Sequence, residues 1–173
     1  MIKYIKIYDL LGFKLCWLAC AFCTQWGHPY LGPLITLFFI LIHLLIVKFK
    51  KLDIKIIFFA IICGFLIDSF LFRSEFIIYE GGVLARMGFA PLWILSMWAG
   101  FSITLLYTLN KIREKYFISG LLGAIGGPLS YSAGVSIGSL NIISSYSYIL
   151  LALFWGLIIP FLFFIINRLD ADV

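Results

Sequence analysis

Six long runs of apolar residues alternate with short polar connections along the chain. They cover residues 10–26, 31–47, 54–72, 90–109, 116–140 and 149–166. Each run has about 17 to 25 residues, the length that an α-helix needs to cross a hydrocarbon core of about 30 Å. The pattern therefore predicts an all-α fold, a polytopic membrane bundle of about six transmembrane helices, with residues 1–173 as a single domain.

Composition points to the same class of protein. Of the 173 residues, 64% are hydrophobic and 12% are charged, and the mean hydropathy is +1.12. Soluble domains carry roughly 25% charged residues. So few polar side chains cannot cover a water-soluble globule, and we expect the lipid bilayer to be the main partner of this chain. The net charge of +5 does not indicate nucleic acid, because the basic residues stand in short clusters between the apolar runs.

These basic clusters also predict an orientation. If the amino terminus lies inside, all but two of the 13 Lys and Arg residues fall on the inner side, and only Arg73 and Arg86 fall outside. Cytoplasmic loops of membrane proteins are enriched in Lys and Arg. We therefore predict that both termini are cytoplasmic. Lys14 interrupts the first apolar run, and we expect its long side chain to extend toward the inner face.

Two connections on the predicted outer side lack the character of free loops. Residues 73–89 form the longest connection, yet four apolar residues stand together at 76–79. We expect this segment to lie along the membrane interface or to fold back into the protein. Residues 141–148 are uncharged and serine-rich, and they are predicted to form a short turn.

The fifth run carries small residues at helical spacing. Offsets of three or four, which place residues in one stripe of a helix, separate Gly120, Gly123, Gly127, Ser130, Gly134 and Gly138. Because Pro128 has no N–H, the carbonyl of Ala124 loses its helical partner, so we expect a kink near the bilayer midplane. The predicted packing and kink positions are Gly123, Gly126, Gly127, Pro128, Gly134 and Gly138. They favour close helix packing alone, or packing combined with a binding site at a broken helix.

Asp68 is the one acidic residue placed well inside a predicted span. Ionisable side chains within spans are costly and usually face the bundle interior or water. It lies about four residues from the outer end of the third run, which corresponds to about 6 Å along a helix. Two interpretations remain open. Asp68 either belongs to a functional site or plays a structural part, through a hydrogen bond from a neighbouring helix or a pair with Arg73.

Other polar and aromatic residues share the predicted outer half with Asp68. We hypothesise a substrate-binding chamber, open toward the outer face and lined by Asp68, Trp93, Trp98, Ser130 and Tyr131. The alternative is an aromatic belt, in which residues such as Trp93 and Tyr131 only anchor the protein at the membrane surface. Trp98 lies too deep for a belt, which favours packing or a site.

The sequence contains no pattern that fixes a reaction. It has no H-E-x-x-H, no G-x-S-x-G, no phosphate-binding loop and no dinucleotide-binding glycine pattern, so we expect no catalytic activity. Cys16, Cys20 and Cys23 share one helix face without a matching His or acid, and they are interpreted as small hydrophobes. We expect neither a metal nor a cofactor. His43 is interpreted as a hydrogen-bonded packing residue.

Three segments together resemble one protein family. They are residues 64–69 (GFLIDS), residues 91–95 (PLWIL) with Trp98, Phe101, Thr104 and Leu105, and residues 123–134 (GAIGGPLSYSAG). In this order the chain resembles the family called domain of unknown function 2878, which consists of small bacterial inner-membrane proteins. The resemblance implies a six-span protein of the bacterial inner membrane. It implies no activity, because the family has no assigned chemistry.

Two functions follow as hypotheses. The first is a small transporter or permease-like protein for a lipid or small amphipathic molecule, with the chamber as its binding site. The alternative is a non-catalytic accessory or scaffold protein of a membrane lipid-modification system. That protein would bind a membrane-protein partner, or a second copy of itself, through the glycine stripe or residues 73–89.

Overall fold

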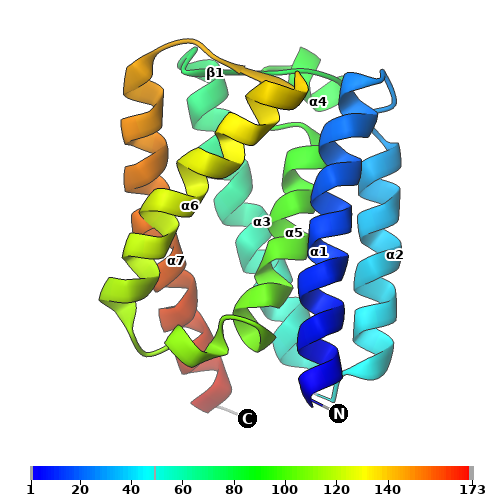
Figure 1. Cartoon of the computed structure of the whole chain (residues 1–173), viewed down its shortest axis with the longest axis vertical. Helices are drawn as coiled ribbons and strands as arrows, with labels where there is room; N and C mark the ends of the chain where they lie inside the picture. Colours follow the sequence, from blue (N-terminus) through cyan, green and yellow to red (C-terminus); the bar gives the residue numbers. More distant parts are fainter. Residues whose placement is uncertain (1, 49, 172–173) are drawn as a thin grey trace.

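Six long helices lie side by side in the computed structural model, which describes residues 2–48 and 50–171 (Figure 1). They are α1 (Ile2–Gln25), α2 (Leu31–Ile46), α3 (Lys50–Arg73), α5 (Leu92–Tyr107), α6 (Tyr116–Ile137) and α7 (Ser145–Ala171). A short helix, α4 (Val83–Arg86), and the 3-10 turn η1 (Asn110–Ile112) lie in connections. The chain is 80% helical, so the all-α class is confirmed.

Three of the helices have the length and composition of membrane spans. Among the described residues, α1, α3 and α7 are long and apolar enough to cross a bilayer. Helices α2 and α5 are also apolar, but each has 16 residues, which corresponds to about 24 Å and falls short of a core of about 30 Å. The structure therefore supports association with a membrane.

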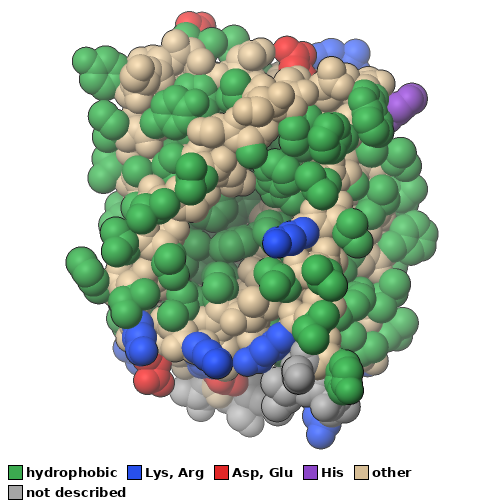
Figure 2. Space-filling view, viewed as in Figure 1, with side chains coloured by type: hydrophobic (Ala, Val, Ile, Leu, Met, Phe, Trp, Pro, Cys, Tyr) green, Lys and Arg blue, Asp and Glu red, His purple; other side chains and the backbone are tan. Residues whose placement is uncertain are grey.

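Helix α5 is the central element of the bundle. It packs against α1, α2 and α3, while α6 packs mainly against α7 and touches α1 only slightly. In Figure 1, α6 crosses the molecule diagonally from α7 toward α1. Both described ends of the chain lie at the same end of the bundle, and most Lys and Arg side chains visible in Figure 2 gather there.

Some helix ends differ from the expected runs. Helix α1 begins at Ile2 rather than near residue 10, because Asp9 is bonded inside the protein and does not end the helix. Helix α7 begins at Ser145, so half of the predicted serine-rich turn is helical, and its first two residues belong to a short strand. Ser147 is buried there, and its hydroxyl donates a hydrogen bond of 2.8 Å to the carbonyl of Phe76.

The segment 73–89 folds back into the protein, which was one of its two expected placements. Its strand β1 (Ile77–Tyr79) pairs antiparallel with β2 (Leu140–Ile142), so that Tyr79 lies opposite Leu140. The side chains of Ile77 and Tyr79 are buried. The sequence did not indicate this strand pair, because each strand has only three residues and no alternating pattern can develop over that length.

The glycines of α6 differ in their surroundings. A Cβ atom on Gly123 would overlap the carbonyl oxygen of Trp155, and one on Gly127 would overlap the Trp155 ring, so these glycines let α7 approach closely. A Cβ on Gly126 would meet nothing within 4 Å. The helix continues through Pro128 and ends at Gly138, whose φ of +87° forms a left-handed cap.

Candidate functional site

Asp68 lies at the centre of a buried hydrogen-bond cluster. Its carboxylate is 0% exposed and accepts three bonds. One oxygen, Oδ1, accepts from the hydroxyl of Tyr79 at 2.6 Å and from the hydroxyl of Tyr131. The other, Oδ2, accepts from the indole Nε1 of Trp98 at 2.6 Å. We call Asp68, Tyr79, Trp98 and Tyr131 the Asp68 cluster.

Four elements bring this cluster together. Asp68 comes from α3, Tyr79 from β1, Trp98 from α5 and Tyr131 from α6. Gly64 stands one helical turn before Asp68, and a Cβ atom there would overlap the Trp98 ring. The spacing of glycine and aspartate on α3 therefore makes the space through which the indole reaches the carboxylate.

The cluster explains how an acid is held without a basic partner. Hydrogen bonds to a carboxylate stabilise its charged form, and three donors offset much of the cost of burial. Burial and the neighbouring Asp68 raise the pKa of Tyr79 well above its ordinary value, so its hydroxyl remains protonated and can donate. Arg73 does not pair with Asp68; its guanidinium lies over the Phe89 ring, 4.4 Å from the centroid.

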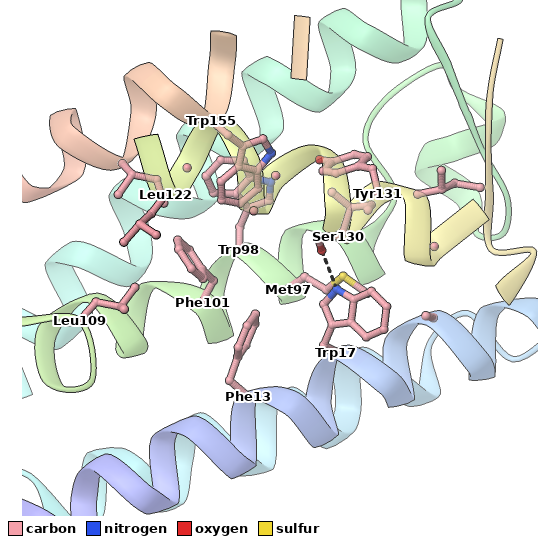
Figure 3. A pocket seen from close by; sticks show the side chains of 18 of the residues that line it. Phe13, Trp17, Met97, Trp98, Phe101, Leu109, Leu122, Ser130, Tyr131 and Trp155 are labelled. Atoms are coloured by element: carbon pink, nitrogen blue, oxygen red, sulfur yellow. Dashed lines mark hydrogen bonds between the residues drawn. The ribbon is translucent and has the colours of Figure 1, made fainter. Parts of the chain in front are cut away.

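Trp98 and Tyr131 also form part of the wall of a cavity of about 350 Å³ (Figure 3). This interhelical cavity lies between α1, α5, α6 and α7, and its volume falls within the range of ligand pockets. It is lined mainly by Phe13, Trp17 and Ala21 of α1, Trp93, Met97, Trp98 and Phe101 of α5, Ser119, Leu122, Gly123, Gly126, Gly127, Ser130 and Tyr131 of α6, and Trp155 and Ile159 of α7.

The cavity is elongated along α6. Its lining runs from Ser119 to Gly134 on that helix, about 22 Å at the usual rise per residue. Leu109 and Ile112 lie at the end near η1, and Leu140 of β2 lies at the opposite end. An elongated apolar space of this kind suits a hydrocarbon chain better than a compact polar metabolite.

Four of the five predicted substrate-binding residues line this cavity. They are Trp93, Trp98, Ser130 and Tyr131. Asp68 lies one layer behind the wall and contacts Trp98 and Tyr131 there. Trp93 is 1% exposed and donates from Nε1 to the carbonyl of Glu80 at 2.9 Å, so it is a packed residue rather than a surface anchor. Whether any of the five contacts a substrate stays a prediction.

Stacked aromatic rings form one wall of the cavity. The rings of Trp98 and Trp155 are stacked, with centroids 4.5 Å apart and an angle of 14° between their planes. Phe101 meets Trp155 edge-on at 5.4 Å, and Phe13 lies 5.7 Å from Phe101. Phe13, Phe101 and Trp155 were not predicted as site residues, although Phe101 belongs to the segments that resemble the family. Aromatic residues are abundant in the apolar runs of this chain, so an aromatic side chain does not by itself mark a site.

The cavity opens on the side of the bundle, between α1 and α6. Figure 2 shows the surface hollowed there, with a basic side chain beside the hollow. One hydrogen bond crosses between the two helices, from Nε1 of Trp17 to the hydroxyl of Ser130 at 3.0 Å. Lys14 is exposed halfway along α1, one residue after Phe13 and three before Trp17, both of which line the cavity. Helix geometry therefore places Lys14 at the edge of this opening.

A second buried polar cluster lies where α1, α2, α3 and α5 meet. Its centre is His43, whose Nδ1 lies 2.9 Å from Oδ1 of Asp9 and whose Nε2 lies 2.8 Å from Oδ1 of Asp53. Tyr107 donates its hydroxyl to Oδ2 of Asp53 at 3.1 Å. His43 is hydrogen-bonded as expected, but its two carboxylate partners were missed. Asp9 and Asp53 stand at the ends of apolar runs, where acids are usually solvated.

The cysteines of α1 serve packing contacts. Cys16, Cys20 and Cys23 are free and buried, and Sγ of Cys20 lies 3.7 Å from the hydroxyl of Thr36 on α2. Within residues 2–48 and 50–171, no group of three or more His, Cys, Asp and Glu side chains is arranged to hold a metal ion.

Comparison with known proteins identifies the family. The family described as "Protein of unknown function (DUF2878)" matches residues 6–161, which is most of the chain. The chain belongs to this family. The match includes the Asp68 cluster, the lining of the interhelical cavity, and Asp9, His43, Asp53 and Tyr107, which we call the His43 cluster. No curated protein and no solved structure matches the chain.

Proposed function

We propose that this DUF2878 protein is a permease-like carrier that takes a lipid or small amphipathic molecule into the interhelical cavity. The observation that carries the proposal is the cavity itself: about 350 Å³, aromatic and apolar, elongated, and open on the side of the bundle. Soluble substrates would enter from an end of the bundle. A side opening between two helices suits a molecule that is already dissolved in the bilayer.

The proposal includes six spans in the bacterial inner membrane, with both termini cytoplasmic. It is supported by the shared location of both described chain ends and by the basic side chains that gather there. The outward faces of the helices are also apolar. Large exposed hydrophobic side chains occur on all six long helices, for example Leu15, Phe38, Phe58, Leu129 and Leu157. Surfaces of this kind are stable against lipid tails rather than against water.

Polar groups around the cavity suit the head of an amphipathic molecule. Lys14 stands at the edge of the side opening, where a cation attracts an anionic group strongly because the surroundings are apolar. Trp155 contributes a buried Nε1–H that has no partner among the described residues. The Lys14 ammonium can attract an anionic oxygen of a ligand whose hydrocarbon part occupies the cavity. The Trp155 N–H can donate a hydrogen bond to an oxygen of the same ligand.

The accessory or scaffold function is less well supported. It required the glycine stripe to be free for a partner, but Gly120, Gly123 and Gly127 pack against α7 of the same chain. The strand β1 is likewise paired with β2. The glycine stripe is therefore occupied from within the same chain, whereas residues 73–89 keep exposed side chains such as Val83 and Met87.

Filling the cavity tests the proposal. Since a Cβ on Gly126 meets nothing within 4 Å, Gly126→Leu should fold and place its side chain in the cavity. We expect native mass spectrometry of the purified protein to show co-purified lipid on the wild type. Affinity for a fluorescent fatty acid should fall at least about tenfold in the variant, because the lost apolar contacts are worth at least about 1.4 kcal/mol.

Matched variants make this test specific. Gly126→Ala adds one methyl group and should keep binding, and Leu129→Phe changes an exposed position of the same helix and should also keep it. Lys14→Gln should weaken binding of the fatty acid more than of the corresponding fatty alcohol. Equal binding by wild type and Gly126→Leu would contradict a ligand in the cavity. In proteoliposomes, movement of a fluorescent lipid between leaflets then distinguishes a carrier from a binding protein.

A further inference from the structure

The His43 cluster contains a contact that a neutral histidine cannot satisfy. Both ring nitrogens lie within hydrogen-bond distance of a carboxylate oxygen, Nδ1 at 2.9 Å from Asp9 and Nε2 at 2.8 Å from Asp53. A neutral imidazole has one N–H and one lone pair. If both carboxylates were ionised, one of the two contacts would bring a lone pair against a negative oxygen.

One additional proton turns both contacts into hydrogen bonds. It can reside on the second ring nitrogen, which gives an imidazolium between two carboxylates, or on the carboxyl oxygen that faces the bare nitrogen. In either case His43, Asp9 and Asp53 together hold one proton more than a neutral histidine with two carboxylates. The observed distances therefore specify the number of protons in the cluster.

Burial makes this proton necessary. His43 and Asp9 are 0% exposed and Asp53 is 1% exposed, so water cannot compensate a repulsive contact. Oδ2 of Asp9 is buried without a hydrogen-bond partner among the described residues, whereas Oδ2 of Asp53 accepts from Tyr107. The described side chains form no Lys or Arg ion pair with either acid.

The groups that face the ring come from three helices. Asp9 comes from α1, Asp53 from α3, and Tyr107 from α5, whose ring meets the imidazole edge-on at 5.2 Å. On the first turns of α3, Lys50, Lys51 and Lys55 are exposed and form no ion pair with Asp9 or Asp53. Among the described side chains, no Lys or Arg contacts either acid, so the proton offsets their charge at the point of contact.

We propose that Asp9, His43 and Asp53 form a proton-binding site, whose occupied form clamps α1, α2 and α3 together at the end of the bundle that carries both described chain ends. The proton is the bridge between helices: without it, one of the two bonds from α2 is lost. The site is separate from the interhelical cavity, and the inference does not depend on the proposed carrier function.

Nitrogen NMR tests the site directly, because the chain has only two histidines. Full-length protein labelled with ¹⁵N-histidine in lipid nanodiscs should give two pairs of ring signals, and His43→Gln identifies the pair from His43. His28 lies in an exposed turn and serves as the reference. At pH 7.5, we expect both His43 nitrogens to be protonated. In Asp53→Asn, the amide can donate to Nε2, so only Nδ1 should remain protonated.

Infrared spectroscopy tests whether the proton resides on a carboxyl oxygen of Asp9 or Asp53 instead of on the ring. A His43 with one bare nitrogen, together with a carboxylic acid band that Asp9→Asn or Asp53→Asn removes, also supports the site. A bare nitrogen with no such band overturns it. If Asp53→Asn does not fold, Asp9→Asn provides the same comparison with the roles of the two nitrogens exchanged.

The stabilisation of the helix bundle by the bound proton can be measured separately, as the pH dependence of the unfolding temperature. A folded state that holds an extra proton loses stability as the pH rises through the release of that proton. The unfolding temperature of the wild type should therefore fall over the pH range in which the His43 signals change, and that of Asp53→Asn should not. A parallel change in both proteins would show that proton binding does not clamp the helices.

Discussion

At the scale of single residues, the molecule keeps its buried acids in two different ways. Asp68 accepts bonds from three neutral donors and needs no positive charge. Asp9 and Asp53 share His43. The difference matters for function, because neutral donors fix the geometry of the cavity wall at any ordinary pH, whereas a shared histidine responds to protons.

Substituting Asp68 tests its positioning role. In Asp68→Asn, the single amide oxygen can accept either from the hydroxyls of Tyr79 and Tyr131 or, after rotation, from the Nε1–H of Trp98, but not from all three. At least one buried donor then loses its acceptor, which should cost about 1–3 kcal/mol. Trp98→Phe removes one of these donors, so Asp68→Asn should cost measurably less in that background. Thermal unfolding by circular dichroism measures all four proteins, and strictly additive effects would contradict the bond.

Sequence reasoning could find part of this site. Asp68, Trp98 and Tyr131 could be selected because polar and aromatic residues deep in an apolar run are few and costly. Tyr79 could not, since it stands in a connection and reaches Asp68 only through the pairing of β1 with β2. Asp53 could not be selected either, because the lysines near it in sequence suggest a solvated loop.

At the scale of elements, α6 is a helix with two different glycine faces. All three glycines border the cavity, but Gly123 and Gly127 also contact Trp155 of α7 at close range, whereas Gly126 has open space beside it. The stripe was visible in the sequence, because helical spacing alone defines it. The sequence could not show which glycines contact a neighbouring helix and which have open space beside them, because this depends on where Trp155 lies.

These two faces predict opposite effects of the same small substitution. Gly123→Ala would drive a methyl group into the Trp155 carbonyl, and main chain cannot rotate away, so a loss of about 1–3 kcal/mol is expected. Gly126→Ala meets open space and should gain up to about 1 kcal/mol from helix propensity. Thermal unfolding of the two variants provides the measurement. A loss of equal size in both would show that α6 does not pack as described.

At the scale of the whole molecule, two buried polar clusters join different sets of elements. The Asp68 cluster joins α3, β1, α5 and α6, and the His43 cluster joins α1, α2, α3 and α5. Helix α6 takes part in the first and not in the second. It packs mainly against α7 and is bonded to α3 through Tyr131 and Asp68, whereas it has few contacts with α1, where Trp17 donates to Ser130, so the opening between α1 and α6 is a weakly packed seam.

The use of this seam by lipids requires a defined orientation in the membrane, and labelling of single cysteines can establish it. In a background with Cys16, Cys20, Cys23 and Cys63 replaced by alanine, a cysteine is placed at one of four exposed positions, His28, Lys48, Arg86 or Lys111. With six spans and cytoplasmic termini, His28 and Arg86 lie outside. These two should react with an impermeant thiol reagent in intact spheroplasts, and the other two only after lysis.

Labelling at Lys111 before lysis would mean that α6 crosses in the opposite direction. Lys14 would still lie at the seam, but the end with the His43 cluster would then face the outer side, and its proton would come from there.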